Sequence, residues 1–190
     1  MAQEPDVVVH VFVIRRELDV PLGFDLGLGP VGVGAVHFGA PRAGSLPKVG
    51  LLAHSALLVK TMSGAYHVIE FGATGFEFSS TGPKLHVHGA ARSYPVQVET
   101  LSSDAEGSVE TVKLIGNGEE VVWTKQLRGK AVPDRPGGRR PTVEETRNKM
   151  QELMCGTYGL GRTCHDAQES TRKWLGVWDE EEFRWPILFL

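Results

Sequence analysis

One cysteine stands where a reactive thiol is expected. Cys164 directly follows Thr163, a residue type that often caps a helix, and a helical pattern follows. The unpaired backbone N–H groups and the dipole at a helix start favour an anion and lower the pKa of a thiol there. Cysteine is also among the most buried residue types, so a core cysteine is the other interpretation. Cys155 falls at a predicted helix end, where the dipole disfavours a thiolate, and is assigned to packing.

Two histidines could activate such a thiol, although either one alone would more often be structural. His54 opens the strand-like run HSALLV, and His67 lies in the next run, YHVIEF, 13 positions further on (54 to 67). A tight turn at Ser63–Gly64 would bring the two rings together at one end of a hairpin. A thiolate nucleophile needs a base, and the base needs a group that orients its second ring nitrogen. We therefore expect Cys164 to be the nucleophile, His54 the base and His67 the residue that orients His54.

Two further patterns are weaker candidates for a functional site. Glycines at positions 27, 29 and 32 match a GxGxxG dinucleotide fingerprint, but no helical pattern follows, and we interpret them as a loop. His86 and His88 alternate on a predicted strand and could hold zinc, yet no third ligand is indicated nearby. We interpret them as a solvated strand face. The sequence predicts neither a metal nor an organic cofactor.

The bulk composition is that of one globular domain. The chain has 190 residues, 41% hydrophobic and 23% charged, which suffices for one core and is too short for two. The net charge of −3 gives no general attraction to nucleic acid, and no apolar run is long enough for an integral membrane segment. Two cysteines and an N-terminus without a signal-peptide pattern predict reduced thiols and an intracellular, cytoplasmic location. We expect a single domain over residues 1–190, with its oligomeric state open.

Strand-like sequence dominates the first two thirds of the chain. Ser63–Gly64 and Asn117–Gly118 indicate hairpin turns. Residues 21–50 are rich in Gly and Pro and are predicted as a long loop with a short strand at 33–38. The other predicted strands are β-branched or apolar runs: Val7–Ile14, Leu51–Lys60, Ala65–Phe71, Lys84–His88, Val96–Glu99, Glu110–Ile115 and Glu119–Leu127.

Helical sequence is confined to the C-terminal part. Thr142 and Glu145 have capping-box spacing, which predicts a helix that runs to about Cys155. A second helix is predicted from near Thr163 to just before Gly176. The segment 128–141 before them is basic and rich in Pro and Gly, and we expect an exposed, mobile connection. Strands first and helices last indicate an α+β fold.

The stretch HSALLVKTMSGAYHVIEFG and the elements around Cys164 resemble the circularly permuted papain-like cysteine hydrolases. In that superfamily a hairpin with the histidine precedes a helix with the nucleophilic cysteine. The capped helix, YGLGRTC and a helix ending in WLG are similar to the PPPDE family, which includes the desumoylating isopeptidases. The hairpin is also similar to NlpC-type and lecithin-retinol-acyltransferase-like proteins. The resemblance covers about Val7–Phe76 and Thr142–Gly176, and implies an antiparallel sheet packed against C-terminal helices that carry Cys164.

The resemblance also implies a reaction. A peptide or isopeptide bond in a protein or peptide substrate would be cleaved through a thioester, without a cofactor. One alternative is a lipid-dependent thiol acyltransferase or phospholipase of the same superfamily, for which the terminal WPILFL is the candidate membrane-facing element. Another is a non-catalytic binding domain that kept the fold, because Thr163 and Ala167 stand where relatives usually carry Asn and an aromatic residue.

Overall fold

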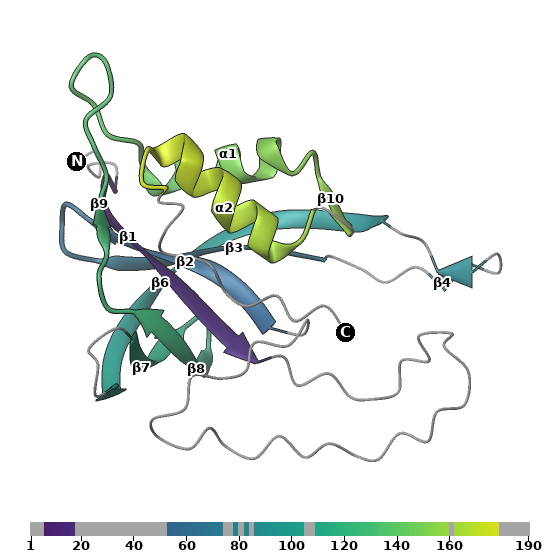
Figure 1. Cartoon of the computed structure of the whole chain (residues 1–190), viewed down its shortest axis with the longest axis horizontal. Helices are drawn as coiled ribbons and strands as arrows, with labels where there is room; N and C mark the ends of the chain where they lie inside the picture. The colour runs from purple at the N-terminus through teal and green to yellow at the C-terminus, as the bar shows by residue number, and fades with distance from the viewer. Residues whose placement is uncertain are drawn as a thin grey trace.

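Two helices lie on one face of a mostly antiparallel sheet (Figure 1). The computed structural model describes residues 6–17, 53–73, 78–79, 82–83, 86–104, 109–159 and 162–178. The predicted loop and short strand at 21–50 lie outside these residues. The α+β fold class is therefore confirmed at the level of its layers, helices on one side and sheet on the other.

Eight strands form the main sheet, in the order β10-β6-β3-β2-β1-β8-β7 with β9 on β1, and two short strands form a separate pair. The long hairpin of β2 and β3 turns at Met62–Ala65, close to the predicted turn. The main strands are β1 (Val8–Glu17), β2 (Ala53–Thr61), β3 (Tyr66–Ala73), β6 (His86–Ser103), β7 (Val109–Gly116), β8 (Glu119–Gln126), β9 (Lys130–Ala131) and β10 (Thr157–Gly159). The separate pair is β4 (Phe78–Ser79) and β5 (Gly82–Pro83).

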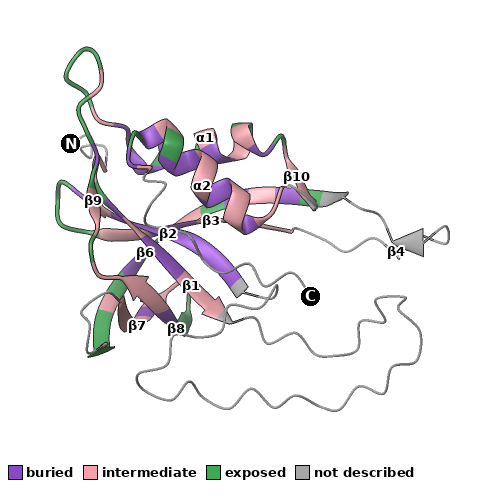
Figure 2. Cartoon of the chain, in the orientation of Figure 1, coloured by how far each residue is buried: buried purple, intermediate pink, exposed green. Residues whose placement is uncertain are grey.

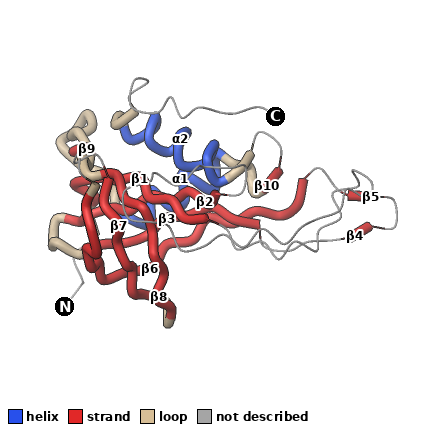
Figure 3. Tube along the Cα trace, turned by 60° about the horizontal axis from the view of Figure 1, so that its bottom comes forward, coloured by secondary structure: helices blue, strands red, loops and turns tan. Residues whose placement is uncertain are grey.

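Strand β6 closes the sheet on itself. Its first part pairs with β3 up to Val96, and from Gln97 onward it pairs with β7. Because β7 pairs with β8 and β8 pairs with β1, six strands form a closed ring, β6-β3-β2-β1-β8-β7. The tube view in Figure 3 shows this curved sheet with the helices on one side of it. Alternate side chains of each strand therefore point into the ring or away from it.

Two apolar cores result from this alternation. One is enclosed by the ring and consists of Ile14, Ala56, Leu58, Val68, Val96, Val112, Leu114 and Trp123. The other lies between the sheet and the helices and includes Val11, Val13, Leu57, Val59, Ile69, Phe71, Met150, Met154, Ala167 and Leu175. Figure 2 shows buried residues on the facing sides of helices and sheet. Burial of each large side chain contributes roughly 1.5–3 kcal/mol, so these cores fix where β2 lies beneath the second helix, α2 (Cys164–Leu175).

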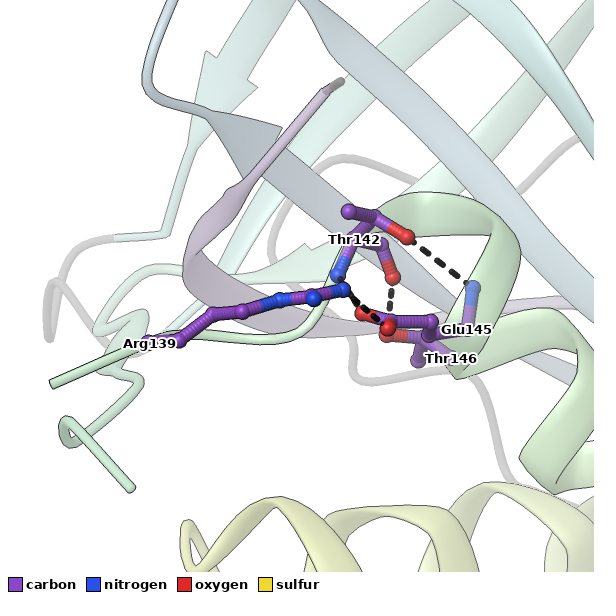
Figure 4. Close-up of polar contacts among 4 residues, drawn as sticks. All are labelled: Arg139, Thr142, Glu145 and Thr146. Carbon is purple, nitrogen blue, oxygen red and sulfur yellow. Dashed lines mark hydrogen bonds and ion pairs between the residues drawn. The ribbon is translucent and has the colours of Figure 1, made fainter. Parts of the chain in front are cut away.

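The first helix, α1 (Val143–Leu153), begins as the sequence predicts. The Glu145 backbone N–H donates to Thr142 Oγ1 at 3.1 Å, and the Thr142 N–H donates to the Glu145 carboxylate at 2.8 Å. Thr146 Oγ1 donates to the Thr142 carbonyl, and Arg139 forms an ion pair with Glu145 (Figure 4). The predicted capping box is confirmed. Such a cap stabilises a helix by about 1 kcal/mol.

The segment 128–141 is mostly exposed, as the sequence predicts, but it is also docked on the sheet and on the second helix. Its residues Lys130 and Ala131 form β9 on the edge of β1, and the buried Val132 donates its N–H to a β1 carbonyl. Further along, the Arg135 guanidinium lies 3.7 Å above the Trp174 ring of the second helix. Composition alone missed this docking because the free edge of β1 supplies the hydrogen-bond partners.

Candidate active site

Cys164 is the first residue of α2 (Cys164–Leu175). Thr163 caps this helix in a second capping box, where its hydroxyl accepts the Asp166 N–H and the Asp166 carboxylate accepts the Thr163 N–H at 2.7 Å. The helix ends at Gly176, which has a left-handed conformation with φ 72°. Cys164 is 3% exposed, so its thiol is both buried and at the positive end of the helix dipole.

Three groups hydrogen-bond to the Cys164 sulfur. They are the His54 side chain, the backbone N–H of Ser55 and the hydroxyl of Tyr158. The first two come from the start of β2, and Tyr158 lies on β10, the short strand just before α2. The Tyr158 ring stacks on Phe71, with ring centroids 5.9 Å apart, and this packing holds the phenol beside the thiol.

His54 is fixed on its other side by a carboxylate. Its Nε2 lies 2.9 Å from Glu70 Oε2, and the His54 side chain is 9% exposed. In the antiparallel register Ala56 is opposite Glu70, which makes Glu70 a diagonal neighbour of His54 on the same face of the sheet. Because Nε2 bonds to Glu70, the bond to Cys164 is left to Nδ1. The Trp123 ring, with its centroid 5.8 Å from that of His54, packs against the imidazole.

The electrostatics of the contacts among Cys164, His54 and Glu70 favour an ion pair between sulfur and imidazole. Burial alone would lower the pKa of His54, but its hydrogen bonds and charge interactions with Cys164 and Glu70 raise that pKa to about 9. Burial alone would raise the pKa of Cys164, but His54, the Ser55 N–H and Tyr158 lower it. Burial likewise opposes ionisation of Glu70, yet His54, Arg16 and Arg92 hold its pKa low. At neutral pH these shifts favour thiolate, imidazolium and carboxylate side by side.

His67 does not orient His54, which corrects the expectation from the sequence. His67 pairs with Val59 near the turn of the β2–β3 hairpin, five positions along β2 from His54 (54 to 59), and its Nε2 lies 3.4 Å from Asp6 Oδ2. Five residues of strand span roughly 16 Å. The side chain at 67 also faces the layer opposite to Glu70, because it lies an odd number of residues away. Glu70 holds the place that His67 was expected to hold.

Three contributors to the site were missed from the sequence. Glu70 carried a signal: it is the one charged residue within the run YHVIEF, and hairpin register places it near His54. Ser55 acts through its backbone N–H, for which residue type gives no signal. Tyr158 depends on β10, a strand of three residues that pairs with β6. So short a strand has no recognisable periodicity.

The weaker candidates are placed as follows. Cys155, assigned to packing, is instead an exposed free thiol with φ 51°, so that assignment is wrong. His88 is exposed on β6, as a solvated strand face requires, and the three glycines at 27, 29 and 32 lie outside the described residues. Among the described residues, no three His, Cys, Asp or Glu side chains are grouped so that they could hold a metal ion. In the same part of the chain, no helix has the length and apolarity to cross a membrane.

Comparison with known proteins assigns no family to this chain. No protein-family model, no curated protein and no solved structure matches it. The function proposed below therefore depends on the chemistry of Cys164, His54, Glu70 and Tyr158.

Proposed function

We propose that this chain is a cysteine hydrolase with a circularly permuted papain-like arrangement, which cleaves a peptide or isopeptide bond through a thioester. The observation that carries the proposal is the continuous chain of contacts from the Cys164 sulfur to His54 and from His54 to Glu70. A nucleophile, a base and a group that orients the base are the minimum set for covalent acyl transfer. The order of hairpin first and cysteine helix last is also that of the permuted papain-like proteins.

The reaction begins with the thiolate of Cys164. It attacks the substrate carbonyl, so that a C–S bond forms and the carbonyl oxygen becomes an oxyanion. The imidazolium of His54 then gives its proton to the leaving nitrogen, the C–N bond breaks, and the amine departs. Water, deprotonated by the now neutral His54, attacks the thioester and releases the acid. Glu70 keeps the ring oriented and stabilises its charged form in each half of the cycle.

Tyr158 is suited to stabilise the oxyanion. Burial and the nearby thiolate charge raise the pKa of its phenol to about 12, so the hydroxyl keeps its proton and remains a donor. The backbone N–H of Cys164, at the start of α2, donates to the Tyr158 hydroxyl oxygen and holds that hydroxyl in place. Removal of one such donor typically costs a hundredfold or more in kcat, roughly 3 kcal/mol.

The pKa of His54 supports an amide rather than an ester as the bond cleaved. An amine is a poor leaving group unless it is protonated, and an imidazolium with a pKa of about 9 is present in nearly full amount at neutral pH. An ester leaves without that assistance more readily. This supports peptide or isopeptide substrates over the lipid acyl esters that an acyltransferase or phospholipase would use.

Thiol labelling followed by substrate capture tests the proposal. Iodoacetamide should alkylate Cys164 at pH 6 much faster than the exposed Cys155, each adduct being located by mass spectrometry. Isopeptide-linked and linear peptides should then form a thioester on Cys164 that hydroxylamine removes, and Cys164→Ala should form none. Equal alkylation of the two cysteines at pH 6 would contradict the proposal and favour a non-catalytic domain. Thioester formation from acyl lipids alone would favour the acyltransferase alternative.

A further inference from the structure

Two neighbouring arginines at the end of β1 lie on opposite sides of the reacting pair. In the β1–β2 register Arg15 is opposite Ser55, whose N–H contacts the Cys164 sulfur, and Arg16 is opposite His54. Successive side chains of a strand point to opposite faces. β1 therefore places one guanidinium on the sulfur side of the site and one on the imidazole side.

Each of the two arginines interacts with a different part of the site. The charge of the Cys164 thiolate acts on Arg15, and burial combined with Arg172 lowers the pKa of Arg15 to about 10, so it stays a cation at neutral pH. The Arg16 guanidinium lies 4.9 Å from the centroid of the Trp123 ring, the ring that packs on His54. Both arginines are half-buried. Partial burial strengthens their field and still allows contact with a ligand.

The described charges around Cys164 and His54 are mainly positive. Besides Arg15 and Arg16, Arg92 pairs across the strands with Glu70. The carboxylates there are Glu70, which bonds His54, and Asp166, which caps α2. The described cations, without His54, are Arg15, Arg16, Arg92 and Arg172.

Acylation changes this charge balance in a specific way. When Cys164 forms a thioester, its negative charge disappears, and Arg15 loses an anion whose field acts on it. A carboxylate carried by the acyl chain, a few bonds from the carbonyl carbon, would replace that charge at the moment it is lost. A neutral acyl chain would leave the guanidinium less well compensated in a half-buried site. On these grounds an acidic acyl group should be favoured over a neutral one at Cys164.

We propose, building on the function above, that Arg15 and Arg16 form a carboxylate-recognition pair, and that Cys164 acts on acidic peptides whose carboxylate lies next to the scissile carbonyl. Guanidinium groups suit this role because their planar donors match a carboxylate. Arg15 contacts the carboxylate on the sulfur side, and Arg16, on the other face of β1 above the Trp123 ring, acts on it through its positive charge. Arg92 adds to the positive field through its place opposite Glu70.

Two small alkylating reagents test the carboxylate-recognition pair without a known substrate. Iodoacetate carries a carboxylate and iodoacetamide a neutral amide, and with both the Cys164 sulfur displaces iodide as the C–S bond forms. The ratio of the two rates cancels the thiolate fraction, which any of these variants could alter. At Cys164 the iodoacetate-to-iodoacetamide ratio should exceed that at Cys155 in the same molecule. It should fall roughly fivefold in Arg15→Gln and in Arg16→Gln, and less in the corresponding Lys variants.

Arg147→Gln is the matched control, because Arg147 lies on α1 and pairs with Glu144 on the helix surface. Its ratio should equal that of the wild type. An unchanged ratio in both Arg15→Gln and Arg16→Gln, with rapid alkylation of Cys164 by both reagents, would overturn the carboxylate-recognition pair and leave the proposed hydrolase intact. Slow alkylation of Cys164 by both reagents in the wild type would instead contradict the hydrolase itself.

Peptide chloromethyl ketones identify the source of the carboxylate. One should carry Glu and the other Gln as the residue that bears the chloromethyl ketone, so that only a side-chain charge a few bonds from the reacting carbonyl differs. The Glu reagent should inactivate the wild type several-fold faster, and the preference should disappear in the double variant of Arg15 and Arg16. Equal inactivation by the two peptides, despite a preference for iodoacetate, would overturn the assignment to acidic side chains. Equal slowing of both peptides in the arginine variants would show that the arginines act only on Glu70 and His54.

Discussion

The two ends of the β2–β3 hairpin each hold a histidine beside a carboxylate, but only one of these histidines also bonds a cysteine. At the start of β2, His54 lies 2.9 Å from Glu70 and bonds Cys164. Near the turn, His67 lies 3.4 Å from Asp6, whose side chain is 41% exposed. A histidine–carboxylate pair is therefore not in itself a sign of catalysis. What distinguishes the first end is a buried thiol at a helix start, with hydrogen-bond partners from two strands, β2 and β10, around it.

Removal of Cys164 or His54 should have the largest effect on the reactivity that distinguishes the two ends of the hairpin. Cys164→Ala should abolish turnover, and His54→Ala should slow alkylation of Cys164 at pH 6 by about a hundredfold or more, because the imidazolium that stabilises the thiolate is lost. Iodoacetamide kinetics with mass spectrometry measure the second effect. Alkylation in His54→Ala as fast as in the wild type would mean that the helix dipole alone activates the thiol.

Glu70→Gln should have the next largest effect. A neutral amide can still bond Nε2 but no longer stabilises the charged ring, so kcat should fall roughly ten- to a hundredfold with little change in KM. Glu99→Gln is the matched control, since Glu99 is an exposed strand carboxylate paired with Lys113. Steady-state kinetics on the captured substrate measure both variants. Equal rates in Glu70→Gln and Glu99→Gln would remove Glu70 from the site.

The pH profile sharpens the comparison further. Because the pKa of His54 is raised to about 9, its proton should remain available for the leaving amine until the pH passes that value, and the rate should fall above it. By linkage, the stability that this shift contributes is fully present below pH 6.5 and is lost as the pH rises through about 9. In Glu70→Gln the fall in rate should move to lower pH. An alkaline limit near 6.5 in the wild type would contradict the ion pair.

His67→Ala should have the smallest effect. Alkylation of Cys164 and turnover should both match the wild type, and the free energy of unfolding should fall by less than about 1 kcal/mol, as expected for a partly exposed ion pair. Asp6→Asn should cause a similar small loss in urea denaturation. A clear loss of alkylation rate in His67→Ala, without loss of stability, would show coupling between the two ends of the hairpin.

Much of the local structure could be predicted from the sequence because it depends on neighbouring residues. The hairpin turns, both helix starts and the helix end at Gly176 each follow from residue types within a few positions. The long strand β6 could not be predicted in this way. Gly89 and Pro95 divide it by composition, and separate strands were expected at Lys84–His88 and Val96–Glu99. In the structure, Gly89 lies where a Cβ atom would come within 2.4 Å of the Phe71 ring, a contact between distant residues.

The candidate site likewise combines residues that could be predicted from local sequence with residues that could not. Cys164 and His54 could be predicted because a helix start and a strand start mark them. The choice of His67 over Glu70 was wrong because the prediction used spacing along the chain instead of strand register. Counting across the turn, with Ala56 opposite Glu70, gives the right neighbour. The placement of β10 and Tyr158 needed the tertiary pairing with β6.

The element order has a consequence for biosynthesis. His54 emerges from the ribosome on β2, and Cys164 follows 110 residues later (54 to 164), after every strand of the closed ring. Bringing Cys164 to His54 closes a long loop, which lowers the conformational entropy of the chain. This cost is offset only when the helices can pack on the finished sheet. Until then the thiol of the nascent chain lacks its imidazolium neighbour and reacts as an ordinary cysteine. Vectorial synthesis thus delays formation of the Cys164–His54 pair until folding of this unit is almost finished.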